Sequence, residues 1–147
     1  MMTDYLIDTH AHLDFSELYD RLEEVLNNAK NSNVKRIISI STNLNKIDKI
    51  INLSYENEEV FFTVGTHPNE VLKDKNNSNY DLIYNISKKN KCVGIGECGL
   101  DYHYGKDSIK EQKLSFFTQI NVARDTGLPL IIHSRDADED MIDILTS

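Results

Sequence analysis

The sequence lacks a long hydrophobic run and contains few cysteines. No apolar stretch among its 147 residues approaches the ~20 residues that a membrane-spanning helix needs. The amino terminus has no basic segment followed by an apolar one and a small-residue cleavage site, so we expect no secretory signal. Two cysteines, Cys92 and Cys98, are too few for a disulfide framework or a zinc knuckle, which predicts reduced, buried thiols. Together these absences predict a cytoplasmic protein that does not interact with a membrane.

Positive charge is also scarce. Sixteen lysines and arginines against 24 aspartates and glutamates give a formal net charge of −8. This balance argues against a wide basic face that holds nucleic acid by its phosphates. It does not exclude a phosphodiester substrate, because divalent cations in a pocket supply their own positive charge.

Strand-like and helix-like segments alternate along the chain, without an internal repeat or a low-complexity tract. Five short apolar segments predict strands over residues 6–10, 34–41, 60–65, 92–96 and 129–133. Helical spacing of apolar residues predicts helices over 16–29, 47–54, 80–89, 108–126 and 136–147. The expected helix caps are Ser16, Ser108 with Glu111, and Asp136 with Glu139.

This alternation predicts an α/β fold with parallel strands joined by right-handed crossovers. An open doubly wound sheet can stop at five strands, whereas a (β/α) barrel needs eight. No G-x-G-x-x-G sequence follows the first strand, so the nucleotide-binding form of the open sheet lacks its fingerprint. The position of the polar residues favours an incomplete TIM-barrel fold of about five parallel strands with flanking helices.

Two histidines, His10 and His12, lie one residue apart at the carboxyl end of the first predicted strand. Side chains alternate along a strand, so both imidazoles point to one face while Ala11 points to the other. A single histidine on an apolar face is usually a core or surface residue with its hydrogen bonds satisfied. A pair with this spacing instead indicates two ligands for one cation.

Further candidates follow the carboxyl ends of the other strands, the edge at which both architectures place active sites. Glu97 is flanked by glycines and can bridge two cations through its two oxygens, or else it caps a helix or faces solvent. His133 ends an apolar strand and is a candidate metal ligand. His67, before Pro68, is a candidate substrate contact, or else it forms a structural hydrogen bond.

Two charged residues near the last predicted strand have two interpretations each. Arg135 can bind a phosphate through its planar set of donors, or form an ion pair with Asp101 or Asp136. Asp101 can orient an imidazole by accepting a hydrogen bond from it, or it can cap a turn. The adjacent residues are expected to belong to a loop, where an aromatic ring could stack on a base: Tyr102, His103 and Tyr104.

Five segments in this order resemble the TatD family of metal-dependent deoxyribonucleases, which are amidohydrolase-like TIM-barrel hydrolases. They are residues 8–14 (DTHAHLD), 65–68 (GTHP), 94–102 (GIGECGLDY), 112–123 with Gln119, and 128–137 (LPLIIHSRDA). The resemblance implies that His10 and His12 bind one divalent cation, that the catalytic Glu97 bridges two, and that His133 binds the second. It implies hydrolysis of phosphodiester bonds in DNA ends or single strands, from a 3′ end. His67, Arg135 and Asp101 are the expected substrate-binding residues.

The resemblance also implies parts that these residues do not contain. Members of the family are longer and have a further histidine after strand six and an aspartate, the expected general base, after strand eight. Residues 1–147 are therefore expected to be the N-terminal part of a single barrel with two unpaired edge strands. The missing strands would come from a longer chain, another polypeptide or self-association, or the half-barrel would be catalytically inactive.

Two divalent cations are the expected cofactors. Mg²⁺ or Mn²⁺ suits a hydrolase that acts on phosphate, whereas the imidazoles also suit Zn²⁺. A second enzymatic hypothesis keeps this metal site but assigns it to amides, lactones or aminoacyl-tRNA esters, which the wider superfamily also hydrolyses.

Overall fold

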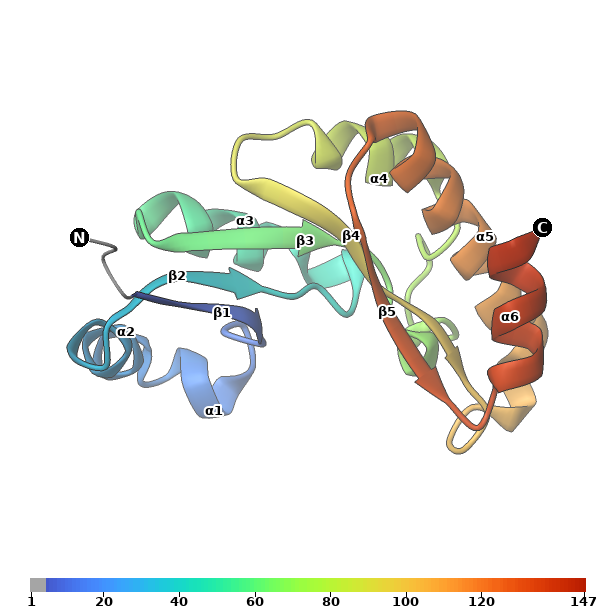
Figure 1. The fold of residues 1–147 in the computed structure, drawn as a ribbon, viewed down its shortest axis with the longest axis horizontal. Helices are drawn as coiled ribbons and strands as arrows, with labels where there is room; N and C mark the ends of the chain where they lie inside the picture. Colours follow the sequence, from blue (N-terminus) through green and yellow to red (C-terminus); the bar gives the residue numbers. More distant parts are fainter. Residues whose placement is uncertain (1–4) are drawn as a thin grey trace.

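The structure is a computed structural model that describes residues 5–147, in which strands and helices alternate (Figure 1). The five strands are β1 (Leu6–Ala11), β2 (Val34–Ser39), β3 (Val60–Val64), β4 (Cys92–Asp101) and β5 (Leu130–Arg135). The helices are α1 (Ser16–Tyr19), α2 (Leu22–Asn31), α3 (Ile47–Glu56), α4 (Tyr80–Ser87), α5 (Ile109–Thr126) and α6 (Asp138–Thr146). Short 3₁₀ helices span Leu44–Lys46, Pro68–Glu70 and Lys106–Ser108.

All neighbouring strands are parallel, and their order in the sheet is the order in the chain, β1-β2-β3-β4-β5. Each crossover therefore moves one strand further in the same direction. This is the progression of a (β/α) barrel, whereas a doubly wound sheet reverses direction at a switch point. The described residues thus form a parallel half-barrel.

The main apolar core lies between the inner strands and the helices that cover them. Phe62 of β3 and Ile95 of β4 are fully buried and cluster with Ile50 of α3, Ile83 of α4 and Val122 of α5. These helical residues belong to the buried faces of α3, α4 and α5. The packing holds the carboxyl ends of β3 and β4 in place, next to the candidate site.

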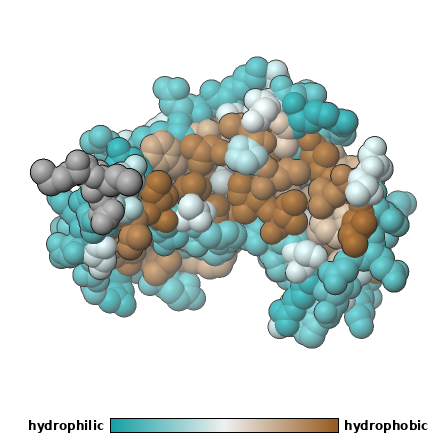
Figure 2. All heavy atoms as spheres, in the orientation of Figure 1, coloured by the Kyte–Doolittle hydropathy of each residue, from teal (hydrophilic) through white to brown (hydrophobic). Residues whose placement is uncertain are grey.

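The two edge strands are much more exposed than the inner ones. On β1, Leu6 and Ile7 are 61% and 48% exposed, and Ile132 on β5 is 43% exposed. Within residues 5–147 neither strand has a neighbour on its outer side. Apolar residues accordingly gather in a band across the middle of the face shown in Figure 2.

The helix predicted over residues 16–29 is divided into α1 and α2. Arg21, with φ −125° and ψ 27°, leaves the helical conformation between them, and its side chain forms an ion pair with Glu24. Ser16 does not act as the predicted cap. Phe15 occupies the N-cap position of α1, and the Ser16 hydroxyl donates to the carboxylate of Glu17.

The other two predicted caps form no side-chain cap hydrogen bond. Ser108 is the N-cap residue of α5, as predicted, but its hydroxyl donates to the carbonyl of Gly105 and accepts from Gln112 instead of capping the first turn. Asp136 lies at φ 53° and its carboxylate contacts His103, 3.0 Å away, instead of the first turn of α6. In both cases a contact with another residue has replaced the local cap.

Cys92 and Cys98 are both free thiols. Cys98 is fully buried, whereas Cys92 is partly buried, and burial raises the pKa of Cys92 to about 11. Both thiols are therefore protonated near neutral pH. Separately, none of the helices within residues 5–147 combines the length and apolar character needed to cross a bilayer.

Candidate metal centre

The carboxylate of Glu97 lies between two groups of histidines at the carboxyl ends of the strands. Its Oε2 atom is 3.4 Å from His10 Nε2 and 3.8 Å from His12 Nε2. Its Oε1 atom is 3.4 Å from His133 Nδ1 and 3.9 Å from His67 Nε2. Within each group of three residues, the candidate ligand atoms all lie within 4.8 Å of one another. By its donor chemistry, His10, His12 and Glu97 would hold one divalent metal ion, and Glu97 with His133 would hold a second.

The backbone fixes Glu97 in this position. Strand β4 continues beyond the predicted end at residue 96, so Glu97 lies inside it, and its amide donates to the carbonyl of Ser41 over 2.8 Å. The amide of His67 donates to the adjacent Thr42 carbonyl over 2.9 Å. A Cβ atom on Gly65 would lie 2.5 Å from the Cα atom of Gly96, so this close approach of β3 and β4 requires glycine.

Hydrogen bonds to other groups determine which nitrogen of His12 and His133 faces Glu97. His12 Nδ1 lies 3.1 Å from the carbonyl of Ile40, which can only accept, so Nδ1 carries the proton and Nε2 is free to bind metal. His133 Nε2 lies 3.0 Å from Asp101 Oδ2, so in the same way its Nδ1 lone pair faces Glu97.

His67 has the opposite arrangement. Its Nδ1 accepts from the amide of Asn69 over 3.1 Å, which leaves the proton of the neutral ring on Nε2. Burial lowers the pKa of His67 below its usual value although the charge of Glu97 acts in the other direction, so the ring is neutral. Its Nε2–H therefore donates towards His133 Nδ1, 3.1 Å away, and the ring is better suited to donating a hydrogen bond than to binding metal.

Asp101 lies behind His133 and is 1% exposed. Oδ2 also accepts from Asn69 over 3.0 Å, and Oδ1 accepts from the amide of Tyr104 over 2.9 Å. Burial acts to raise the pKa of Asp101, but the hydrogen bonds from Tyr104, Asn69 and His133 outweigh it and hold the pKa below its usual value. Asp101 thus both orients an imidazole and caps a turn, the two alternatives open from the sequence.

Arg135 is exposed at the end of β5, outside these histidine groups. Its guanidinium lies over the ring of Tyr104, with Cζ 4.7 Å from the centroid. Neither ion pair considered from the sequence forms, because Asp101 binds His133 and Asp136 binds His103.

A cavity of about 380 Å³ opens beside the histidine groups. In addition to His10, His12, His67 and Glu97 it is lined by Phe15, Thr42, Lys46, Asn69 and Glu70. Sequence reasoning did not assign a role to these five residues. Phe15 and Asn69 directly follow the 8–14 segment and the Gly65–Pro68 motif, which is a usable signal, whereas nothing local marks Lys46.

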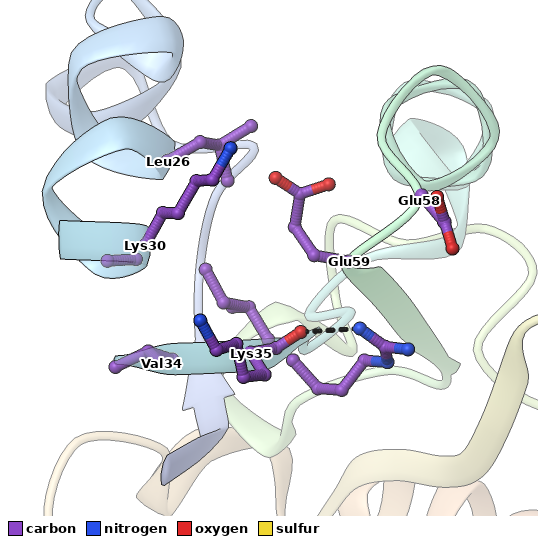
Figure 3. Close-up of a pocket in the computed structure, with 9 residues that line it drawn as sticks. Leu26, Lys30, Val34, Lys35, Glu58 and Glu59 are labelled. Atoms are coloured by element: carbon purple, nitrogen blue, oxygen red, sulfur yellow. Dashed lines mark hydrogen bonds between the residues drawn. The ribbon is translucent and has the colours of Figure 1, made fainter. Parts of the chain in front are cut away.

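Another hollow, of about 230 Å³, lies at the opposite end of the sheet, where β2 and β3 begin (Figure 3). Lys30 and Lys35 face Glu59 across it, and Glu58 lies at its side (Figure 3). It contains no histidine or cysteine and is separate from the candidate metal centre.

Comparison with known proteins supports the assignment of a metal centre around Glu97. The family described as "TatD related DNase" matches residues 7–147. The chain is 38% identical over 140 residues to "Uncharacterized metal-dependent hydrolase YabD" of Bacillus subtilis (strain 168), covering 95% of this chain and 54% of YabD. It is 26% identical over 140 residues to "3'-5' ssDNA/RNA exonuclease TatD" of Salmonella typhimurium, covering 95% of this chain and 54% of that protein.

The fold of the chain also matches part of a solved structure of this family. The crystal structure of YJJV, a TatD homolog from Escherichia coli K12, superposes with a TM-score of 0.86 at 25% identity, covering 96% of this chain and 55% of YJJV. The predicted half-barrel is thereby confirmed, and the chain spans about half the length of each of these proteins. The sequence match, the fold and the histidine–glutamate site together place this chain in the TatD-related DNase family of metal-dependent hydrolases.

Proposed function

We propose that the whole protein hydrolyses phosphodiester bonds of DNA, acting on ends or single strands from the 3′ side. The observation that carries this proposal is the position of Glu97, with one oxygen towards His10 and His12 and the other towards His133. Two-metal sites of this kind are typical of enzymes that cleave phosphate esters. The exonuclease named among the relatives supports DNA as the substrate.

The residues of the chain have distinct roles in this proposal. His10, His12, Glu97 and His133 hold two divalent cations, for which Mg²⁺ or Mn²⁺ is favoured and Zn²⁺ is the alternative. When bound, such cations polarise phosphoryl oxygens and lower the pKa of water. The Nε2–H group of His67 donates a hydrogen bond to a phosphate oxygen, and the exposed guanidinium of Arg135 binds a neighbouring phosphate.

We expect alanine at His10 or Glu97 to reduce metal-dependent release of nucleotides from single-stranded DNA by roughly 100-fold or more, because each change removes a ligand. Calorimetric titration with Mn²⁺ should show weaker binding in the same variants. Glu23→Gln, at an exposed glutamate of α2, is the matched control and should retain both. Undiminished cleavage by the His10 and Glu97 double variant would rule out this function.

The same site could act on a carbonyl carbon instead of phosphorus. The description of YabD names a hydrolase without naming the bond that it cleaves. Assays with amides, lactones and aminoacyl-tRNA esters beside DNA separate the two hypotheses, since a nuclease releases nucleotides and leaves the others intact.

We also propose that residues 1–147 are the N-terminal part of one barrel, and that further polypeptide covers the outer edges of β1 and β5. The support is the exposure of apolar side chains on both strands together with the unpaired edges. That polypeptide is the remainder of a longer chain, another protein or a second copy. Without such a cover the half-barrel would be catalytically inactive.

A further inference from the structure

We infer that the cavity beside His12 is a nucleotide subsite, in which Phe15 stacks on a base and Lys46 contacts a phosphate. The inference rests on the proposed function and names the residues that would recognise the substrate. The cavity has a volume of about 380 Å³, which falls within the range of small-ligand pockets, and it adjoins the candidate metal centre.

Phe15 presents a fixed aromatic ring to this cavity. The ring stacks on His12 with centroids 4.8 Å apart and an interplanar angle of 16°. The Phe15 carbonyl accepts from the amides of Leu18 and Tyr19, which fixes the residue at the start of α1. His12 covers one side of the ring, yet the residue is 43% exposed and lines the cavity, so a base can stack on the accessible part.

Lys46 provides the positive charge of the cavity. The nearby lysines are engaged elsewhere: Lys49 donates to the carbonyl of Asp14 over 2.6 Å, and Lys73 pairs with Glu70 over 2.8 Å. The other oxygen of Glu70 accepts from Asn43 over 3.1 Å, so Glu70 is already paired.

The ammonium group of Lys46 lines the cavity and forms no hydrogen bond or ion pair within residues 5–147, although its charge acts on the carboxylates of Glu70 and Asp14. A phosphate is the natural partner for such a group, because it is a compact cation in a site that binds a polyanion. Phe15 follows β1 and Lys46 follows β2, so the subsite lies on the His10–His12 side of Glu97.

Substrates that lack one base test the role of Phe15. Single-stranded oligonucleotides carry a stable abasic analogue at either nucleotide flanking the cleaved phosphate, and kcat/KM is compared with that of the intact oligonucleotide. We expect the unmodified enzyme to prefer the intact substrate by roughly 5- to 30-fold at one of the two positions, as for stacking of one base on an aromatic ring. Phe15→Leu should remove most of this preference.

Two further variants control this experiment. Phe15→Trp keeps an aromatic surface and should keep the preference, whereas Tyr55→Leu, at an exposed tyrosine of α3, should leave it unchanged. A preference that persists in Phe15→Leu overturns the stacking role while leaving the proposed function intact. If the unmodified enzyme cleaves neither oligonucleotide, the proposed function and the subsite both fail.

The salt dependence of kcat/KM tests the role of Lys46. Removing one phosphate contact on a single strand should reduce the slope of log(kcat/KM) against log[KCl] by about 0.7. We expect this reduction in Lys46→Gln, the original slope in Lys46→Arg, and no change in Lys89→Gln, an exposed lysine at the opposite end of the sheet. An unchanged slope in Lys46→Gln overturns the phosphate contact.

Discussion

At the scale of single residues, the candidate centre depends on which imidazole nitrogen faces Glu97. The sequence predicted the residues themselves, because a histidine pair on one strand face and polar residues at strand ends are local patterns. It left the roles of Asp101 and His67 open. Asp101 accepts from His133 Nε2 across 32 residues, a contact that no spacing rule predicts, whereas Asn69 donates to His67 Nδ1 within a short 3₁₀ turn.

The contact between Asp101 and His133 leads to a prediction on metal affinity. Asp101→Asn keeps an oxygen for the amide of Tyr104 but places an NH2 group, which cannot accept a hydrogen bond, beside His133 and Asn69. His133 therefore loses the partner that holds Nδ1 towards the metal site. We expect Mn²⁺ affinity to fall about 10- to 100-fold. Calorimetric titration measures the change, and Asp125→Asn, which alters a surface contact with Tyr80, serves as control. Equal affinities for the two variants would contradict the orienting role.

At the scale of elements, α5 does more than cover the sheet. Gln112 and Gln119 lie two turns apart on its buried face. Gln112 pairs with the amide and carbonyl of Asp101, and Gln119 with those of Thr66, directly before His67. Apolar periodicity predicted the helix. It could not predict the contacts of the two glutamines, because their partners lie outside the helix, at the end of β4 and in the loop after β3.

Gln119→Leu should reduce the free energy of unfolding by about 2 to 4 kcal/mol, because it leaves two buried backbone groups of Thr66 without partners. Urea unfolding followed by circular dichroism measures the effect. Lys110→Leu makes a similar change at an exposed position of the same helix and should alter stability by less than about 0.5 kcal/mol. A loss no larger than that of the control would argue against this role of Gln119.

At the scale of the whole molecule, the half-barrel has two exposed parallel edges. Chain order and alternating elements predicted parallel neighbours and the direction of sheet growth. How strongly each edge is exposed depends on the curvature and packing of all five strands. The outcome is a surface on which Leu6, Ile7 and Ile132 face solvent.

We expect residues 1–147 on their own to self-associate, because parallel edges with apolar side chains pair readily with other chains. Lysine at both Leu6 and Ile132 should shift the mass measured by light scattering towards that of a monomer. Leu72→Lys, at a position that is 67% exposed and outside both edge strands, should leave association unchanged. A monomeric unmodified chain would contradict the expectation.

The order of the elements, the parallel sheet and the set of side chains at its carboxyl edge follow from the sequence alone, since they depend on local periodicity and chain connectivity. Other features required the folded molecule: the position of Glu97 between two histidine groups, the burial of Asp101 behind His133, and the unpaired Lys46 in the adjoining cavity. These features arise from contacts between residues that are distant in the chain, where packing and hydrogen bonding override local preference.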